Sequence, residues 1–218
     1  MTKKDPASPP IWVLVLCAAI LIAAPIALYQ FLSNPGGDDF FGQKIDPPRE
    51  AYDFSLTDHH AKPFRLSDLK GKAVLLAFGF THCPDICPTT LNSLAGIYEA
   101  LPEPDRKKLQ VVFVSVDPGR DTPEQLAKYV PFFNDSFLGV TGDEEAIKKT
   151  AKEYGVFYEY APLVSNNTAT SYTVNHSSYV YLIDPAGRFT MLFDYDKLPE
   201  SQRIANDIET ILNAGTGG

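Results

Sequence analysis

The sequence predicts an α/β sandwich with a mixed β-sheet, preceded by one membrane-spanning helix. Apolar runs of strand length alternate with stretches of helical periodicity, the alternation ends in a hairpin and a helix, and an uncharged segment lies near the N-terminus. With 218 residues, 44% of them hydrophobic, the chain is long enough for one globular domain with a sizeable core.

The uncharged segment is residues 11–32, which as a helix would be roughly 33 Å long and could cross a bilayer. Lys3 and Lys4 precede it and two aspartates follow it, so the positive-inside bias predicts a cytoplasmic N-terminus, residues 1–10. A cleaved signal peptide is the alternative. The run is long for a signal peptide, however, and no convincing small-residue cleavage site follows it.

Residues 33–50 are rich in Gly, Pro and Asp and lack periodicity, which predicts a linker. The domain is then expected over residues 51–213, with a flexible tail at 214–218. The formal net charge of -8 disfavours a surface that follows phosphates, so nucleic acid is excluded as an expected partner.

The first elements of the domain are a hairpin and a buried strand. Residues 52–69 predict two short strands around a polar turn with His59 and His60 at its solvated tip. Residues 73–80 form a continuous apolar run, which is typical of a central strand buried on both faces. Apolar residues at helical spacing follow from Leu91 onward, so a helix packed on the sheet is expected.

The alternation then continues to the end of the domain. For the helix that ends near Tyr129, Thr122 is the predicted N-cap and Gln125 its capping-box partner. Gly155 is expected to close the next helix. The remaining predicted elements are strands at 111–118 and 137–142, a helix at 143–155, a hairpin at 178–195 and a last helix at 199–214.

Cys83 and Cys87 follow the buried strand, at the expected start of the first helix. A strand, a cysteine pair at a helix N-terminus and a later hairpin together predict a thioredoxin-like arrangement. Spacing of i and i+4 directs both side chains to one face, and a helix N-terminus favours thiolate over thiol.

Three interpretations of Cys83 and Cys87 remain open on these grounds. A structural disulfide suits an oxidising compartment, although it would close a very short loop and constrain the unfolded chain little. A thiol–disulfide exchange catalyst usually has two residues between its cysteines, whereas three separate these. A metal site is the third, because two thiolates select copper(I) over hard cations.

A metal site would need a further ligand, and the chain has four histidines. His82 adjoins Cys83 and is expected to face solvent or to act outside the ligand set. His176 lies at the end of a predicted long loop, just before a strand, where a thioredoxin-like sheet would bring it towards the cysteines. Two interpretations of His176 remain open: it could be a metal ligand, or it could be a histidine that is simply packed or solvated.

Three aspartates lie near the expected site. Asp85 stands between the cysteines, and Asp117 and Asp121 occur in "DPGRD". They could tune the site or dock a partner. It is equally open that Asp117 starts a turn and that Asp121 helps to begin the next helix.

Three blocks, "FTHCPDICPTTL", "SVDPGRDTPEQLAKYV" and "YTVNHSSYVYLIDPAGRF", resemble the Sco/SenC family of membrane-tethered copper proteins required for assembling the binuclear copper centre of cytochrome c oxidase. The resemblance covers residues 51–213. It implies a thioredoxin-like fold and a copper site made by Cys83, Cys87 and His176. A Cys83–Cys87 disulfide is then expected as the oxidised, copper-free state.

The resemblance implies a membrane-anchored metallochaperone, not an enzyme, that carries copper(I) or copper(II). Expected partners are the copper-centre subunit of cytochrome c oxidase and a thioredoxin-like reductant or an upstream copper carrier. The expected location is the inner membrane, with the domain on the periplasmic side, or the mitochondrial inner membrane. Alternatives are a thiol–disulfide reductase that keeps the target's cysteines reduced, and a peroxidase-like enzyme on the same fold.

Overall fold

The computed structural model describes residues 11–12, 20–25, 40–165 and 168–214 and separates into two units, 1–39 and 40–218. In the first unit, residues 11–12 and 20–25 are helical. The remainder of the predicted membrane helix lies outside the described residues, as do residues 1–10, 33–39 and 215–218. Among the residues described, no helix is long and apolar enough to cross a membrane.

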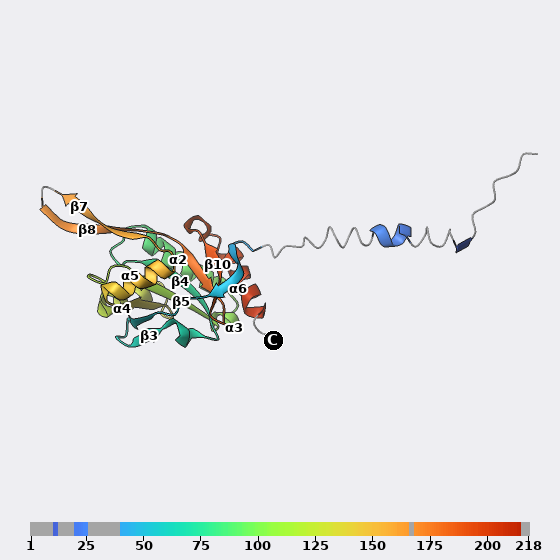
Figure 1. Ribbon diagram of the computed structural model, residues 1–218, viewed down its shortest axis with the longest axis horizontal. Coiled ribbons are helices and arrows are strands. Elements are labelled where there is room, and N and C mark those ends of the chain that lie inside the picture. The colour runs from blue at the N-terminus through green and yellow to red at the C-terminus, as the bar shows by residue number, and fades with distance from the viewer. Residues whose placement is uncertain (1–10, 13–19, 26–39, 166–167, 215–218) are drawn as a thin grey trace, which may run out of the picture. The chain divides into compact units, whose positions relative to one another are not determined.

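The second unit is built on a mixed β-sheet (Figure 1), as the sequence predicts. Within the described residues this sheet has eight strands in the order β1-β10-β9-β4-β5-β6-β2-β3. The pairs β4–β5 and β5–β6 are parallel and the others are antiparallel. The strands are β1 (Gln43–Glu50), β2 (Ser55–Asp58), β3 (Pro63–Arg65), β4 (Ala73–Gly79), β5 (Leu109–Ser115), β6 (Leu138–Thr141), β9 (Val180–Ile183) and β10 (Arg188–Phe193).

Helices cover the sheet, and α2 packs directly on α6. Gly96 permits this close approach, because a Cβ at that position would lie 3.1 Å from Ser201 Oγ. The helices are α2 (Ile86–Ala100), α3 (Glu103–Arg106), α4 (Pro123–Tyr129), α5 (Glu144–Glu153) and α6 (Ser201–Ala214), with short 3-10 turns η1 (Leu66–Leu69), η2 (Val130–Phe132) and η3 (Tyr195–Lys197).

The core of the domain centres on β4 and β5, in which every residue is buried. Continuous apolar runs form such strands because helices or loops cover both faces of the sheet. Leu91 and Leu94 on α2 are fully buried against this core, as their helical spacing predicts. The loop that carries the cysteines therefore starts from a strand, β4, that is buried along its whole length.

Local signals in the sequence are confirmed in most helices. Thr122 caps α4 by accepting a hydrogen bond from Gln125 N at 3.3 Å. Gln125 does not complete the predicted capping box, because its side chain donates to Thr81 Oγ1 at 3.4 Å instead. Gly155 ends α5 with a φ of +67°, a backbone conformation that glycine adopts without strain.

The segment predicted as a linker differs in its second half, because residues 43–50 form β1 and pair with β10. Phe41 N and Gly42 N donate to the Asp207 carboxylate on α6 at 3.1 and 2.8 Å. Prolines and charges hide this strand in the sequence, but an exposed edge strand tolerates them. The compact unit thus begins at Phe40, ahead of the predicted boundary at 51.

A second β-sheet replaces the long loop predicted before His176. Strands β7 (Tyr158–Ser165) and β8 (Thr168–His176) pair antiparallel and, within the described residues, form a two-stranded sheet of their own. This hairpin projects from the rest of the domain in Figure 1. His176 is the last residue of β8, so its position is set by a strand and not by a loop.

The first predicted hairpin exists as β2 and β3, and it extends the main sheet through pairing of β2 with β6. The prediction that His59 lies at a solvated tip is wrong. Only 6% of His59 is exposed, and its Nδ1 accepts a hydrogen bond from Gly139 N at 2.9 Å. His60 is exposed, as predicted.

Candidate metal centre

The two cysteines lie where the central strand β4 meets α2. Cys83 is half-buried in the connecting loop, and Cys87 is in the first turn of α2 with 2% of its surface exposed. A Cβ on Gly79 would lie 2.7 Å from Cys87 Sγ, so this glycine lets the thiol pack on the end of β4. Cys87 N donates to Cys83 Sγ at 3.4 Å, which points the Cys83 sulfur back towards the helix.

His176 approaches from the β7–β8 hairpin, with its Nε2 3.2 Å from Cys87 Sγ. Its other ring nitrogen, Nδ1, lies 2.8 Å from the carbonyl oxygen of Ser177. Since a carbonyl only accepts, Nδ1 carries the proton of the neutral ring and Nε2 presents a lone pair to the thiols. This is the orientation that a metal-binding imidazole requires.

The three ligand atoms, two sulfurs and one nitrogen, all lie within 4.8 Å of one another. Ligands held at roughly 2.0–2.3 Å from one metal ion are themselves separated by roughly 3–4 Å, so small side-chain movements would complete a site. Neither Cys83 nor Cys87 is in a disulfide here. The ligand set and the Cys83–Cys87 disulfide of the oxidised state both stay predictions.

The two thiols have opposite electrostatic environments. A hydrogen bond from Cys87 to the Cys83 sulfur lowers the pKa of Cys83, and weaker hydrogen bonds from the backbone of Cys87 and Asp85 act in the same direction. The same hydrogen bond, followed by burial, raises the pKa of Cys87. Of the two, Cys83 therefore favours the thiolate form and Cys87 favours the protonated form.

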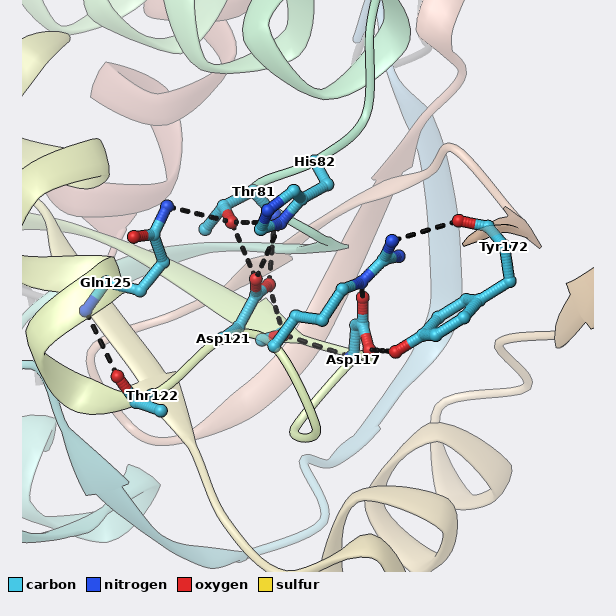
Figure 2. A network of polar contacts seen from close by, with 9 residues as sticks. Thr81, His82, Asp117, Asp121, Thr122, Gln125 and Tyr172 are labelled. Carbon is cyan, nitrogen blue, oxygen red and sulfur yellow. Dashed lines mark hydrogen bonds and ion pairs between the residues drawn. The ribbon is translucent and has the colours of Figure 1, made fainter. Parts of the chain in front are cut away.

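Asp121 organises the start of the cysteine loop through a network of polar contacts (Figure 2), and it is not one of the three grouped residues. Its buried carboxylate accepts hydrogen bonds from Thr81 N at 2.9 Å, Thr81 Oγ1 at 2.6 Å and Ser115 Oγ at 2.6 Å. His82 is exposed, with its Nδ1 3.1 Å from Thr81 Oγ1 and 3.8 Å from Asp121 Oδ1. Both residues fit supporting roles.

Asp117 joins the loop after β5 to the hairpin that carries His176. It is fully buried and accepts hydrogen bonds from Arg120 Nε at 2.5 Å and from Tyr172 OH at 2.7 Å (Figure 2). Asp85 is exposed at the N-cap position of α2, where the described residues show no side-chain capping hydrogen bond. The structure therefore assigns the "DPGRD" aspartates to bracing and leaves Asp85 on the surface.

Arg120, Tyr172 and Phe80 complete the surroundings of the site and were missed from the sequence. Phe80 stacks edge-on against the His176 ring, with 5.9 Å between ring centroids. The motif "DPGRD" draws attention to its aspartates, and nothing in it marks Arg120 as the residue that faces the hairpin. Tyr172 carries no local signal, because its partners are more than fifty residues away in the chain.

Comparison with known proteins gives a family match over residues 42–213, to SCO1/SenC. The mitochondrial protein SCO2 of Saccharomyces cerevisiae is 40% identical over 161 residues, 73% of this chain and 53% of that protein. A SCO2-like protein of Rickettsia felis is 40% identical over 150 residues, 68% of this chain and 71% of that protein. The chain thus spans about half the length of the first relative.

Solved structures agree with this match and confirm the thioredoxin-like fold. Apo Sco1 from Thermus thermophilus superposes with a TM-score of 0.70 at 39% identity, over 80% of this chain and 99% of that one. ScoI from Bradyrhizobium japonicum, solved with copper bound, has a TM-score of 0.66 at 34% identity, over 74% and 99% of the two chains. The chain belongs to the SCO1/SenC family.

Proposed function

We propose that the protein binds copper through Cys83, Cys87 and His176 and delivers it to the binuclear copper centre of cytochrome c oxidase during assembly. The observation that carries the proposal is the convergence of two sulfurs and an imidazole nitrogen within 4.8 Å. It is supported by the copper-bound structures of family members from Bradyrhizobium japonicum and yeast.

The ligand chemistry suits transfer of copper. Two thiolates favour copper(I), and a borderline imidazole nitrogen adds affinity for copper(II). Binding requires both thiols to be deprotonated, and the raised pKa of Cys87 makes its proton harder to remove than that of Cys83. A site with three protein ligands leaves one side open to an incoming ligand from the acceptor.

Zinc is the alternative metal for a site of cysteines and a histidine. Structural zinc sites use four protein ligands, and among the described residues three are grouped here. The ligand count therefore favours copper.

The proposal includes a membrane anchor at residues 11–32 and a domain outside the cytoplasm or the mitochondrial matrix. Support comes from the uncharged segment and from the lysines that precede it. A reporter fused after residue 214 and active only in the cytoplasm would contradict this orientation.

The proposed acceptor is the copper-centre subunit of cytochrome c oxidase, and the upstream partner is a copper carrier or a thioredoxin-like reductant. Reduction of a Cys83–Cys87 disulfide consumes two electrons and two protons, which a partner dithiol supplies as it becomes a disulfide. The reduced pair can then receive copper.

Copper titration tests the proposed ligand set. Wild type, His176→Ala and the control His60→Ala are titrated with copper(II) and copper(I), because His60 is an exposed histidine outside the site. We expect only His176→Ala to lose copper(II) affinity and to change the thiolate-to-copper absorption bands. Equal affinities and spectra for wild type and His176→Ala would contradict the assignment of His176.

A second function, thiol–disulfide reduction of the target's cysteines, is favoured by one observation. Cys83 is the more accessible sulfur and has a lowered pKa, while Cys87 is buried and protonated, as expected for an attacking and a resolving thiol. Oxidase assembly in a deletion strain separates the two functions. Rescue by His176→Ala but not by Cys83→Ser supports reduction, whereas rescue of the deletion by added copper alone supports delivery.

A further inference from the structure

Several hydrogen bonds join the hairpin that carries His176 to one short loop of the domain, residues 116–121. Tyr160 OH donates to Val116 O at 3.0 Å, and Tyr172 OH donates to Asp117 Oδ1 at 2.7 Å. Arg120 Nη1 donates to Tyr172 O at 2.9 Å. Since β7 and β8 share no ladder with the eight-stranded sheet in the described part of the chain, these hydrogen bonds add to the core packing of Val174 in positioning the hairpin.

Arg120 is the residue of that loop that reaches both halves of the metal centre. Its guanidinium lies over the Tyr172 ring, 3.8 Å from the centroid, and 5.7 Å from the centroid of the Phe80 ring. Phe80 directly follows β4 on the way to Cys83, and its ring also contacts His176. Arg120 therefore packs between the cysteine segment and the histidine hairpin.

The strand geometry transmits the position of Tyr172 to His176. Tyr172, Val174 and His176 alternate along β8, so their side chains share one face, and Val174 between them is buried. Four residues of strand span roughly 13 Å, and an extended strand changes length little. Fixing the Tyr172 backbone carbonyl and side chain thus fixes where His176 Nε2 lies relative to Cys87.

Arg120 also has an unfavourable feature, which a residue kept only for the stability of the fold would not need. Its Nη2 is buried without a hydrogen-bond partner in the described residues. Leaving a buried donor unpaired is destabilising, and more so for a charged group. An apolar side chain would avoid this cost but could not bind the Asp117 carboxylate and the Tyr172 carbonyl together.

We propose that Arg120 is a positioning residue of the metal centre: by holding Tyr172 of the β7–β8 hairpin, it keeps His176 within bonding distance of the metal that Cys83 and Cys87 bind. The inference rests on the proposed function in that His176 is taken as a ligand. Planarity matters, because Nε binds Asp117 while Nη1 binds the Tyr172 carbonyl.

The metal-binding test uses Arg120→Gln, Arg120→Lys and Tyr172→Phe, with Arg188→Gln as the matched control. Arg188 also pairs with an aspartate, Asp184, but in the β9–β10 turn at the opposite end of β4 from the cysteines. We expect Arg120→Gln to weaken copper(II) binding about tenfold or more, the usual loss when a partner that orients a ligand is removed. Copper(I) affinity, which the thiolates dominate, should change less.

Arg120→Lys keeps the charge but cannot make both hydrogen bonds, so we expect it to resemble Arg120→Gln. Tyr172→Phe keeps the ring beneath the guanidinium and should cause a smaller loss. In the copper(II) electron paramagnetic resonance spectrum, Arg120→Gln should weaken the nitrogen splitting that His176→Ala abolishes. Full copper(II) affinity and an unchanged spectrum in Arg120→Gln would overturn the proposal, as would full restoration by Arg120→Lys.

Hydrogen exchange of the metal-free protein provides a readout that does not depend on copper. Arg120→Gln should speed exchange of β7 and β8 amides while leaving β4 and β5 unchanged, and Arg188→Gln should leave the hairpin as in wild type. Unchanged hairpin exchange would overturn the proposal. If His176→Ala matches wild type in copper binding, the ligand assignment fails, yet exchange still reports whether Arg120 holds the hairpin.

Discussion

The cysteine segment and the histidine hairpin reach the same point by different means. Cys83 and Cys87 extend from β4, a strand inside the eight-stranded sheet, and Cys87 is packed against Gly79. His176 ends a hairpin that forms its own sheet and is held by the 116–121 loop. We therefore expect the positions of the two sulfurs to be as stable as the fold, and the imidazole to be able to move without unfolding the domain.

Removing a proposed ligand from the cysteine segment should have the largest effect on copper affinity. Cys87→Ser leaves one thiolate, and we expect copper(I) affinity to fall more than about 100-fold, beyond the usual loss of an outer-shell partner. His176→Ala should reduce copper(I) affinity much less. Competition with a copper(I) chelator measures the affinity of both variants. Comparable losses of affinity in the two would contradict the distinction between the cysteine segment and the histidine hairpin.

Truncating a buried side chain of α2, the helix that carries Cys87, should destabilise the whole domain. Leu94 on α2 is fully buried, so Leu94→Ala should lower the free energy of unfolding by about 2–5 kcal/mol. Urea denaturation measures this loss, and hydrogen exchange should speed up across β4, β5 and the hairpin together. An effect confined to α2 would show that the cysteine segment unfolds independently of the sheet.

The two thiols should differ in reactivity with pH. Because the pKa of Cys83 is lowered and that of Cys87 raised, Cys83 should stay thiolate well below the ordinary thiol pKa of about 8.5. Brief iodoacetamide treatment of reduced, metal-free protein near pH 6 should modify Cys83 before Cys87, as peptide mass spectrometry can measure. In His176→Ala the difference should shrink only slightly, since Cys87 is the main cause of the shift.

The smallest effect is expected from loosening the hairpin alone. Tyr160→Phe removes the hydrogen bond to Val116 O, worth about 0.5–1.5 kcal/mol, from an element outside the main sheet. Hairpin amides should exchange faster while the urea midpoint stays within error of wild type. Tyr179→Phe, at an exposed tyrosine beyond β8, is the control. A shift of the global midpoint would mean that the hairpin unfolds with the core.

The same contrast explains what the sequence predicts. The cysteines belong to a local pattern, an apolar strand followed by a helix start, and periodicity alone locates them. The family resemblance singles out His176. It does not indicate that His176 lies on a strand, and it does not single out Arg120. The attachment of the hairpin cannot be read from the sequence, because the atoms of residues 116–121 that it contacts are far away in the chain. Strand β1 was not predicted for a related reason. Its prolines disfavour a strand, but pairing with β10 at the edge of the sheet tolerates them.

Hydrogen bonds fix the point at which the chain enters the domain. Phe41 and Gly42 are fastened to Asp207, and Gln43 then lies level with Leu76 of β4, across Leu192 and Tyr181. The chain therefore enters the sheet level with the middle of β4. If residues 11–32 anchor the chain as proposed, the length of residues 33–39 limits how far from the bilayer the domain can transfer copper.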